Sequence, residues 1–272
     1  MKATKLANYY LPEAKAIDIL GLKVMPFTQT TLNETILRII RQGGHAIIPN
    51  VNVHFANLAY HKPWLHDFFN QAPANFCDGQ GIVLAARILG QHLPARITYA
   101  DWLWSLCSFA ARHDLSFFFL GGEPGRAEKS AAILQKNFPG LRILNAQHGH
   151  FNKTPAHEEN EAMIARINDC RPDILLVGFG MPLQEQWLLK NWPRIDARIA
   201  LTGGGIFDFI SGQLKRAPAW MRHHGLEWFG RFLLEPRRLW RRYFIGNPLF
   251  LWRVLKQKWA PKLRLPAGSD GD

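Results

Sequence analysis

The sequence predicts an α/β fold with a mostly parallel sheet, followed by a helical C-terminal appendage. Short apolar runs rich in β-branched and aromatic residues alternate with segments of helical pattern, which is typical of helices packed on a parallel sheet. Gly-rich stretches follow most of these runs, and a segment rich in Arg, Lys and Trp closes the chain. A chain of 272 residues, 47% of them hydrophobic, is long enough to bury a large core.

The expected elements follow in chain order. Residues 17–26 form an early strand or hairpin, and TTLNETILRIIRQG (30–43) forms a first helix. The expected strands are HAIIPNVN (45–52), ANFCD (74–78), SFFFLG (116–121), LRILNA (141–146), DILLVGF (173–179) and RIALTG (198–203). The helices between them are GIVLAARILG (81–90), RAEKSAAILQKNF (126–138) and EENEAMIARINDC (158–170).

We expect three parts along the chain: an α/β subdomain over 1–112, a second over 113–214, and a basic aromatic appendage over 215–272. Proline does not continue a helix from its preceding residue. The pairs Glu235-Pro236 and Asn247-Pro248 therefore predict three short helices in the appendage.

Polar and Gly-rich loops follow the expected strands: PNVN (49–52), CDGQG (77–81), GGEPG (121–125), GFGMPLQEQW (178–187) and GGGIFDF (203–209). In an open parallel sheet the ligand crevice lies at the carboxyl ends of the strands. Gly lets backbone N–H groups approach phosphate oxygens, and Gly after a strand is also ordinary turn chemistry. Five such loops together predict a nucleotide site.

The net charge of +12 is concentrated at the end of the chain. Residues 215–264 hold 13 Lys and Arg against two Glu, so they carry +11, and they hold five of the ten Trp. No stretch of 18 apolar residues spans a bilayer, and the N-terminus shows no secretory signal. Three Cys without a CxxC pair indicate a reducing compartment and no zinc site.

Several nucleotide-binding classes are disfavoured by their missing motifs. Leu183 stands where a GxGxxG fingerprint starting at Gly178 needs its third Gly, and there is no Walker A sequence. The DxD at Asp270 and Asp272 lies at the extreme C-terminus, so the usual carboxylate pair that holds a metal on a sugar nucleotide is absent from the loops. We therefore expect no metal and no cofactor.

The loops in this order resemble the WecG/TagA/CpsF glycosyltransferase family (glycosyltransferase family 26), from about residue 17 to 255. The most specific segments are "CDGQGIVLAARILG", "FFFLGGEPGRAEKSAAIL", "LLVGFGMPLQEQWL" and "FDFISGQLKRAPAWMRHHGLEWFGRFLLEPRRLWRRY". The resemblance implies two Rossmann-like subdomains and a membrane-associating appendage. It also implies sugar transfer from a nucleoside diphosphate to a lipid-linked saccharide. "LPARITYADW" is most similar to xanthan-type glucosyltransferases of the family.

The resemblance assigns roles residue by residue. Asp78 matches the catalytic aspartate, Asn52 and Asn50 match an early T-x-N whose Thr is Asn here, and Arg96 matches an arginine of the substrate pocket. The family motif after Arg96 is replaced around Tyr99 and Ala100, which we expect to reshape the sugar or acceptor pocket. The remaining expected substrate-binding residues are Gly121, Gly122, Gly178, Gly180, Gln184, Glu185, Gly204 and Asp208. The catalytic arginines of the appendage fall on Arg231, Arg238 and Arg241.

Inverting transfer needs a base for the acceptor hydroxyl and stabilisation of the leaving diphosphate. Asp78 suits the first task, and capping the helix that follows it is the structural alternative. Asn50 and Asn52 share one face of a strand, where they bind sugar hydroxyls or satisfy a strand-end turn. On a continuous helix Arg231, Arg238 and Arg241 form one stripe that binds diphosphate, with Arg237 and Arg242 pointing elsewhere; a solvated or lipid-facing charge run is the alternative.

These inferences predict an inverting UDP-glucose-dependent, metal-independent β-1,4-glucosyltransferase of exopolysaccharide biosynthesis. Its acceptor is an undecaprenyl-diphosphate-linked saccharide, and it binds anionic lipid peripherally at the cytoplasmic face of the bacterial inner membrane. A chain truncated before Arg216 is then expected to keep its fold and lose transfer activity. Two copies pairing through the apolar tail face off the membrane remain an open arrangement.

Three alternative functions stay open. The first is transfer of N-acetylmannosamine or its uronic acid by the same family. The second is nucleic-acid binding through the basic tail, which the neutral body disfavours. The third is a membrane-bound scaffold with an inactive site.

Overall fold

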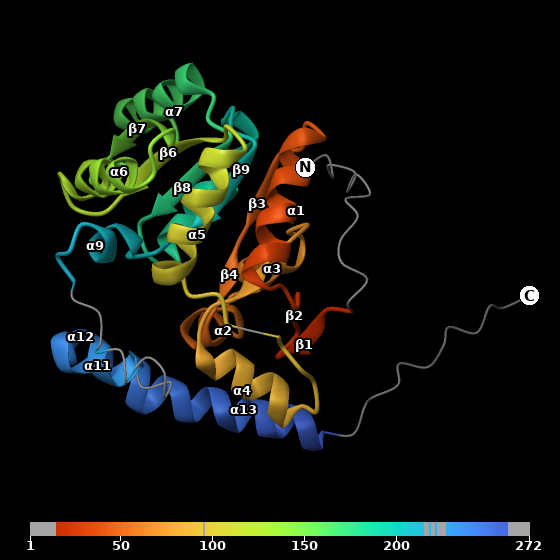
Figure 1. The fold of residues 1–272 in the computed structure, drawn as a ribbon. Coiled ribbons are helices and arrows are strands. Elements are labelled where there is room, and N and C mark those ends of the chain that lie inside the picture. Colours follow the sequence, from red (N-terminus) through yellow and green to blue (C-terminus); the bar gives the residue numbers. More distant parts are fainter. Residues whose placement is uncertain (1–14, 95, 215–217, 219–220, 222–226, 261–272) are drawn as a thin grey trace, which may run out of the picture.

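The computed structural model describes residues 15–94, 96–214, 218, 221 and 227–260. Its centre is a five-stranded sheet in the order β3-β9-β8-β6-β7, and every neighbouring pair in it is parallel (Figure 1). The predicted α/β class with a mostly parallel sheet is therefore confirmed. The early hairpin is also confirmed, because β1 and β2 pair antiparallel.

The strands follow the predicted apolar runs closely. They are β1 Ile17–Ile19, β2 Leu22–Val24, β3 Ala46–Ile48, β4 Asn50–Val51, β5 Phe76–Cys77, β6 Ser116–Gly121, β7 Arg142–Gln147, β8 Ile174–Gly178 and β9 Ile199–Thr202. The expected strand 45–52 is two strands in two sheets. Pro49, which has no N–H for a ladder, separates them, and β4 then pairs in parallel with β5.

The helices include the four predicted in the body. These are α1 Gln29–Arg41, α4 Gln80–Ile88, α6 Arg126–Asn137 and α7 Glu158–Cys170. The others are α2 Val53–Ala59, α3 Pro63–Asn70, α5 Tyr99–Arg112, α8 Leu183–Asn191, the 3-10 turn η1 Trp192–Arg194 and α9 Ile206–Ile210. Three of the added helices, α2, α8 and α9, begin within or just after the loops that follow strands.

The sheet is buried on both faces, which explains why its strands are continuous apolar runs rather than alternating ones. Phe117 and Phe119 of β6 pack with α1, α5, α6 and α9 on one face. Phe118 and Leu120 face the opposite side, where α7, α8, the β1–β2 hairpin, α2 and α4 complete a second core.

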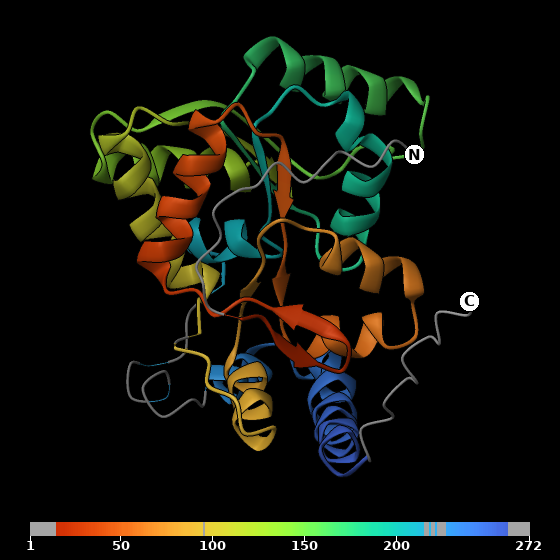
Figure 2. The same ribbon diagram turned by 90° about the vertical axis from the view of Figure 1, so that its right-hand side faces the viewer.

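Both expected subdomains contribute to the central sheet. Strand β3 comes from residues 1–112 and pairs with β9, while α1 and α5 cover the face shared with β6. The small β4–β5 sheet and α4 lie below it, toward the tail (Figure 2). The division at 112/113 stays a prediction, and the two parts share hydrophobic cores.

Between residues 227 and 260 the tail forms two helical segments that are separated at Glu235, and the second, residues 236–259, is one continuous rod. Its elements are α11 Glu227–Leu234, α12 Pro236–Trp240, the π-helix η2 Arg241–Gly246 and α13 Asn247–Trp259. The break before Pro236 is confirmed, because Glu235 leaves helical geometry at φ −131° and ψ 55°. The break before Pro248 is wrong: Gly246 and Asn247 remain helical. The wider π turn precedes Pro248, whose ring and missing N–H are hard to fit into regular α-helical bonding.

Helix α13 is part of the main core. It runs beside α4 and α2 (Figures 1 and 2), with Phe250 and Val254 fully buried among the hairpin, α2 and α4. Arg253 donates to Asn57 Oδ1 at 2.9 Å and to His61 Nε2 at 2.6 Å. A chain truncated before Arg216 exposes this surface, so we expect it to lose stability as well as activity. In the ranges that the structure describes, no helix is long and apolar enough to cross a bilayer.

Candidate active site

A cleft of about 880 Å³ opens where β4, β5, β8 and β9 end. Of the expected site residues, it is lined by Asn50, Asn52, Asp78, Arg96, Gly180 and Gly204. The tail closes it with Trp228, Leu239, Arg242, Tyr243, Asn247, Phe250 and Leu251. The predicted crevice at the strand ends therefore exists, and the appendage forms one of its walls.

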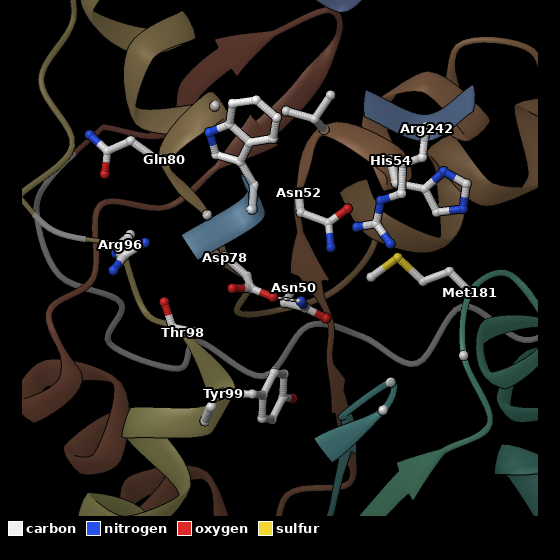
Figure 3. Close-up of a pocket in the computed structure, with 18 of the residues that line it drawn as sticks. Asn50, Asn52, His54, Asp78, Gln80, Arg96, Thr98, Tyr99, Met181 and Arg242 are labelled. Atoms are coloured by element: carbon white, nitrogen blue, oxygen red, sulfur yellow. Dashed lines mark hydrogen bonds between the residues drawn. The ribbon is translucent and has the colours of Figure 1, made fainter. Parts of the chain in front are cut away.

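A chain of three polar side chains lies at the floor of the cleft. The Thr202 hydroxyl donates to Asn50 Oδ1 at 3.0 Å, and Asn50 Nδ2 donates to Asp78 Oδ2 at 3.0 Å (Figure 3). Asn50 and Thr202 are buried, at 2% and 1% exposure. The β4–β5 ladder holds the pair, since Asp78 N also donates to Val51 O at 2.8 Å.

Asp78 does not begin the helix that follows it. Gly79, at φ +110°, is the N-cap residue of α4, and that cap makes no side-chain hydrogen bond. Gly is suited to this backbone conformation because it has no Cβ. The turn at Gly79 lets the Asp78 carboxylate face the cleft instead of the helix (Figure 3).

Asn52 has a structural task as well as a place in the lining. Its Oδ1 accepts from Phe55 N at 3.0 Å and caps α2. Arg96 and Thr98 lie on the opposite side of Asp78 from His54 (Figure 3). The buried Thr98 Oγ1 has no hydrogen-bond partner among the described residues.

Gln184 joins the two Gly-rich loops that line the cleft. Its Oε1 accepts from Gly180 N at 3.2 Å and from Gly204 N at 3.0 Å, while its Nε2 donates to Glu185 Oε1 at 2.8 Å. Gln184 and Glu185 are fully buried and lie outside the lining. The backbone N–H groups of Gly180 and Gly204, which were expected to face phosphate, thus donate to Gln184 instead. Substrate contact by any residue of this group stays a prediction.

The remaining expected loop residues also lie outside the lining. A Cβ on Gly121 would sit 2.4 Å from the Gly178 carbonyl oxygen, so close approach of β6 and β8 requires glycine there. Gly122 N donates to Gly178 O at 3.1 Å. Asp208 is in a salt bridge with Arg126 from α6. Their role in substrate binding stays a prediction.

The structure describes only part of the predicted arginine stripe, whose role stays a prediction. Arg231 and Arg238 lie on α11 and α12, and their side chains fall outside the described part of the chain. Arg241 is exposed, 5.2 Å from the centroid of the Trp240 ring. Arg242, expected to point elsewhere, lines the cleft beside His54 (Figure 3). The prediction that Arg242 points elsewhere is therefore wrong; it assumed a regular α-helix, whereas a π segment begins at Arg241.

Burial sets the protonation of groups around Asp78. Burial, with the charges of Asp78 and Glu185, raises the pKa of Tyr99 well above its usual value, so the phenol stays neutral. Burial also raises the pKa of Cys77, as does the charge of Asp78. A neutral buried thiol is a poor nucleophile.

The sequence analysis missed several lining residues, among them Thr202, Thr98 and His54, and it expected Arg242 to point elsewhere. Thr202 carried a signal, because it is the polar last residue of a buried apolar strand. Arg242 carried none, since its direction depends on a π segment that the residue pattern does not specify.

Comparison with known proteins assigns this fold and its cleft to a class of sugar-transferring enzymes. The profile of the glycosyl transferase WecG/TagA/CpsF family matches residues 17–264, so the chain belongs to this family of glycosyltransferases. It is similar to the N-acetylglucosaminyldiphosphoundecaprenol N-acetyl-beta-D-mannosaminyltransferases of Staphylococcus aureus strains MRSA252 and NCTC 8325. Each is 28% identical over 245 residues, which cover 89% of this chain and 93% of the relative.

Proposed function

We propose that this chain transfers N-acetylmannosamine, with inversion, from its UDP derivative to polyprenyl-diphosphate-linked N-acetylglucosamine. The S. aureus relatives carry that donor group and that acceptor in their names. This favours the N-acetylmannosaminyl alternative over the glucose expected from "LPARITYADW". The observation that carries the proposal is Asp78, held by Asn50 at the floor of a cleft that the tail closes.

The cleft is lined by two kinds of side chain, as a lipid-linked sugar requires. Asn52, Arg96, Thr98 and Arg242 are polar, and the Gly-rich loops add backbone groups. The apolar and aromatic lining residues include Leu84, Trp228, Leu239, Phe250 and Leu251. In this proposal the polar groups bind the sugar diphosphate, and the apolar ones contact the first isoprene units of the acceptor.

In this proposal Asp78 takes the proton of the acceptor hydroxyl as that oxygen attacks the anomeric carbon, and UDP departs from the opposite face. Arginine binds diphosphate through charge-assisted hydrogen bonds, so Arg242 in the lining stabilises the leaving group. Arg231, Arg238 and Arg241 remain proposed contributors from the same tail. Metal independence is part of the proposal.

The exposed side of the tail supports peripheral association with the cytoplasmic face of the inner membrane. Ten large apolar side chains there are exposed: Trp228, Phe229, Leu233, Leu234, Trp240, Phe244, Ile245, Leu249, Trp252 and Trp259. Arg and Lys are interleaved with them. Aromatic residues insert at the headgroup level, and the cations attract anionic lipid.

The test is product formation by the purified full chain with polyprenyl-diphosphate N-acetylglucosamine in detergent and EDTA. The donors are UDP-N-acetylmannosamine, its uronic acid and UDP-glucose. We expect UDP release and a disaccharide product with UDP-N-acetylmannosamine. Turnover with UDP-glucose alone would restore the glucosyl assignment, and no turnover with any donor would contradict the proposal.

A further inference from the structure

The orientation of the Asn50 side chain is fixed from both ends. The Thr202 hydroxyl donates to Oδ1, so Nδ2 must face Asp78. The reverse orientation would place Oδ1 against a carboxylate oxygen, which repels it. The same Thr202 Oγ1 accepts from Asn50 N at 3.4 Å, so backbone and side chain of Asn50 are both tied to the end of β9.

We propose that Asn50 and Thr202 are positioning residues that hold the Asp78 carboxylate in its reactive orientation and stabilise its ionised form. The inference rests on the proposed function and changes the role expected for Asn50, which was sugar binding. At 2% exposure Asn50 presents little surface to a sugar, and both ends of its amide are already engaged. Asn52, two residues on, faces the same cleft but is bonded to Phe55 N instead.

The chain of hydrogen bonds from Thr202 through Asn50 to Asp78, the relay, also links two sheets. Asn50 and Asp78 belong to the β4–β5 unit, whereas Thr202 ends β9 of the central sheet. Val177 and Thr202 are partners in the β8–β9 ladder, which places the hydroxyl on a rigid, fully buried support. A carboxylate that is hydrogen-bonded to such a support keeps its orientation during the reaction.

Kinetics separate positioning from sugar binding. We expect Asn50→Ala to lower kcat about 10- to 100-fold, the usual effect of losing a hydrogen bond to a charged group. KM for the donor stays within about threefold, and the acid limb of the pH profile moves to higher pH. Thr202→Val changes kcat in the same direction by less, and Thr202→Ser, which keeps the hydroxyl, restores it. A raised KM with unchanged kcat and pH profile would overturn the proposal.

A measurement on the carboxyl group itself does not depend on turnover. With ¹³C-labelled Asp carboxyls, the Asp78 signal is the one missing from Asp78→Asn, and its titration is followed by NMR. We expect it to titrate at higher pH in Asn50→Ala and Thr202→Val than in the unchanged chain. The matched control is Asn52→Ala, which removes a nearby amide that is not bonded to Asp78 and leaves the titration in place.

The two measurements fail in different ways. If no donor is turned over but the titration moves as expected, the proposed sugar transfer fails and the relay stands. If Asn50→Ala and Thr202→Val remain folded by circular dichroism and the Asp78 signal titrates as in the unchanged chain, the relay is wrong whatever the enzyme transfers.

Discussion

Asn50 and Asp78 lie 28 positions apart in the chain, and their side chains meet at 3.0 Å, Nδ2 to Oδ2. The contact depends on the parallel register of β4 and β5, in which Asn50 pairs with Phe76 and Val51 with Cys77. Two residues of each strand are enough to bring an amide and a carboxylate together at the floor of the cleft. The roles of the surrounding residues follow from this placement.

Arg242 is predicted to matter more for leaving-group stabilisation than Arg241. We expect Arg242→Ala to lower kcat/KM about 100-fold or more, the scale of losing one preorganised electrostatic contact. Arg241→Ala, its matched neighbour, is expected to cause a smaller loss, since Arg241 is exposed on the Trp240 ring. Initial rates with both variants check this. A larger loss for Arg241 would show that the π segment takes a different form in the bound enzyme.

Gln184 is predicted to act through the loops it joins. Gln184→Ala leaves Gly180 N and Gly204 N without their acceptor, and a buried unsatisfied group costs about 1–3 kcal/mol. We expect a lower free energy of unfolding by urea denaturation together with a raised donor KM. Wild-type stability in this variant would mean that water or another group replaces the amide.

Stability is predicted to fall as pH rises through neutrality because of Glu185. Burial raises its pKa to about 7 against the model-peptide value of 4.5. The folded chain therefore holds this proton more tightly than the unfolded chain. The protonated Glu185 carboxyl contributes its full share to folding stability below about pH 4.5, and that share is lost as pH rises through 7. We expect Glu185→Gln to stabilise the chain by roughly 2–3 kcal/mol more at pH 8.5 than at pH 4.5. Thermal unfolding across pH checks this, and a pH-independent difference would contradict it.

The tail is predicted to bind anionic vesicles through its exposed aromatic side. Trp240, Trp252 and Trp259 are 44%, 58% and 72% exposed. Their joint replacement by Ser is expected to lower partitioning onto phosphatidylglycerol vesicles at least tenfold, as apolar burial in lipid is lost. Turnover of a water-soluble acceptor should be unaffected. Replacement of Trp104, which belongs to the body, is the control for losing a tryptophan. Unchanged flotation of the triple variant would contradict this role.

The sequence alone predicts the sheet well because its strands are short, apolar and separated by Gly-rich turns. It also places Asp78 correctly at a strand end, where the loop carries it into the cleft. The sequence pattern does not show which distant segments of the chain pair with one another. Nothing local shows that Pro49 sends the chain into a second sheet, or that Thr202 reaches Asn50 across 152 positions.

The tail illustrates a second limit of sequence patterns. Pro248 predicts a helix end by local rules, but Asn57 Nδ2 donates to the Gly246 carbonyl at 2.7 Å and helps to fix the rod there. Such a tertiary contact overrides a local breaker. In the same segment Arg242 lines the cleft, whereas Arg241 does not.

Asp78 is the proposed base of the sugar-transfer reaction, and the most direct test of this role compares the unchanged chain with Asp78→Asn. Both receive UDP-N-acetylmannosamine and polyprenyl-diphosphate N-acetylglucosamine, and product is followed alongside donor binding. We predict that kcat falls about 10²- to 10⁴-fold while the dissociation constant of the donor changes little. Transfer by Asp78→Asn at the rate of the unchanged chain would contradict the account.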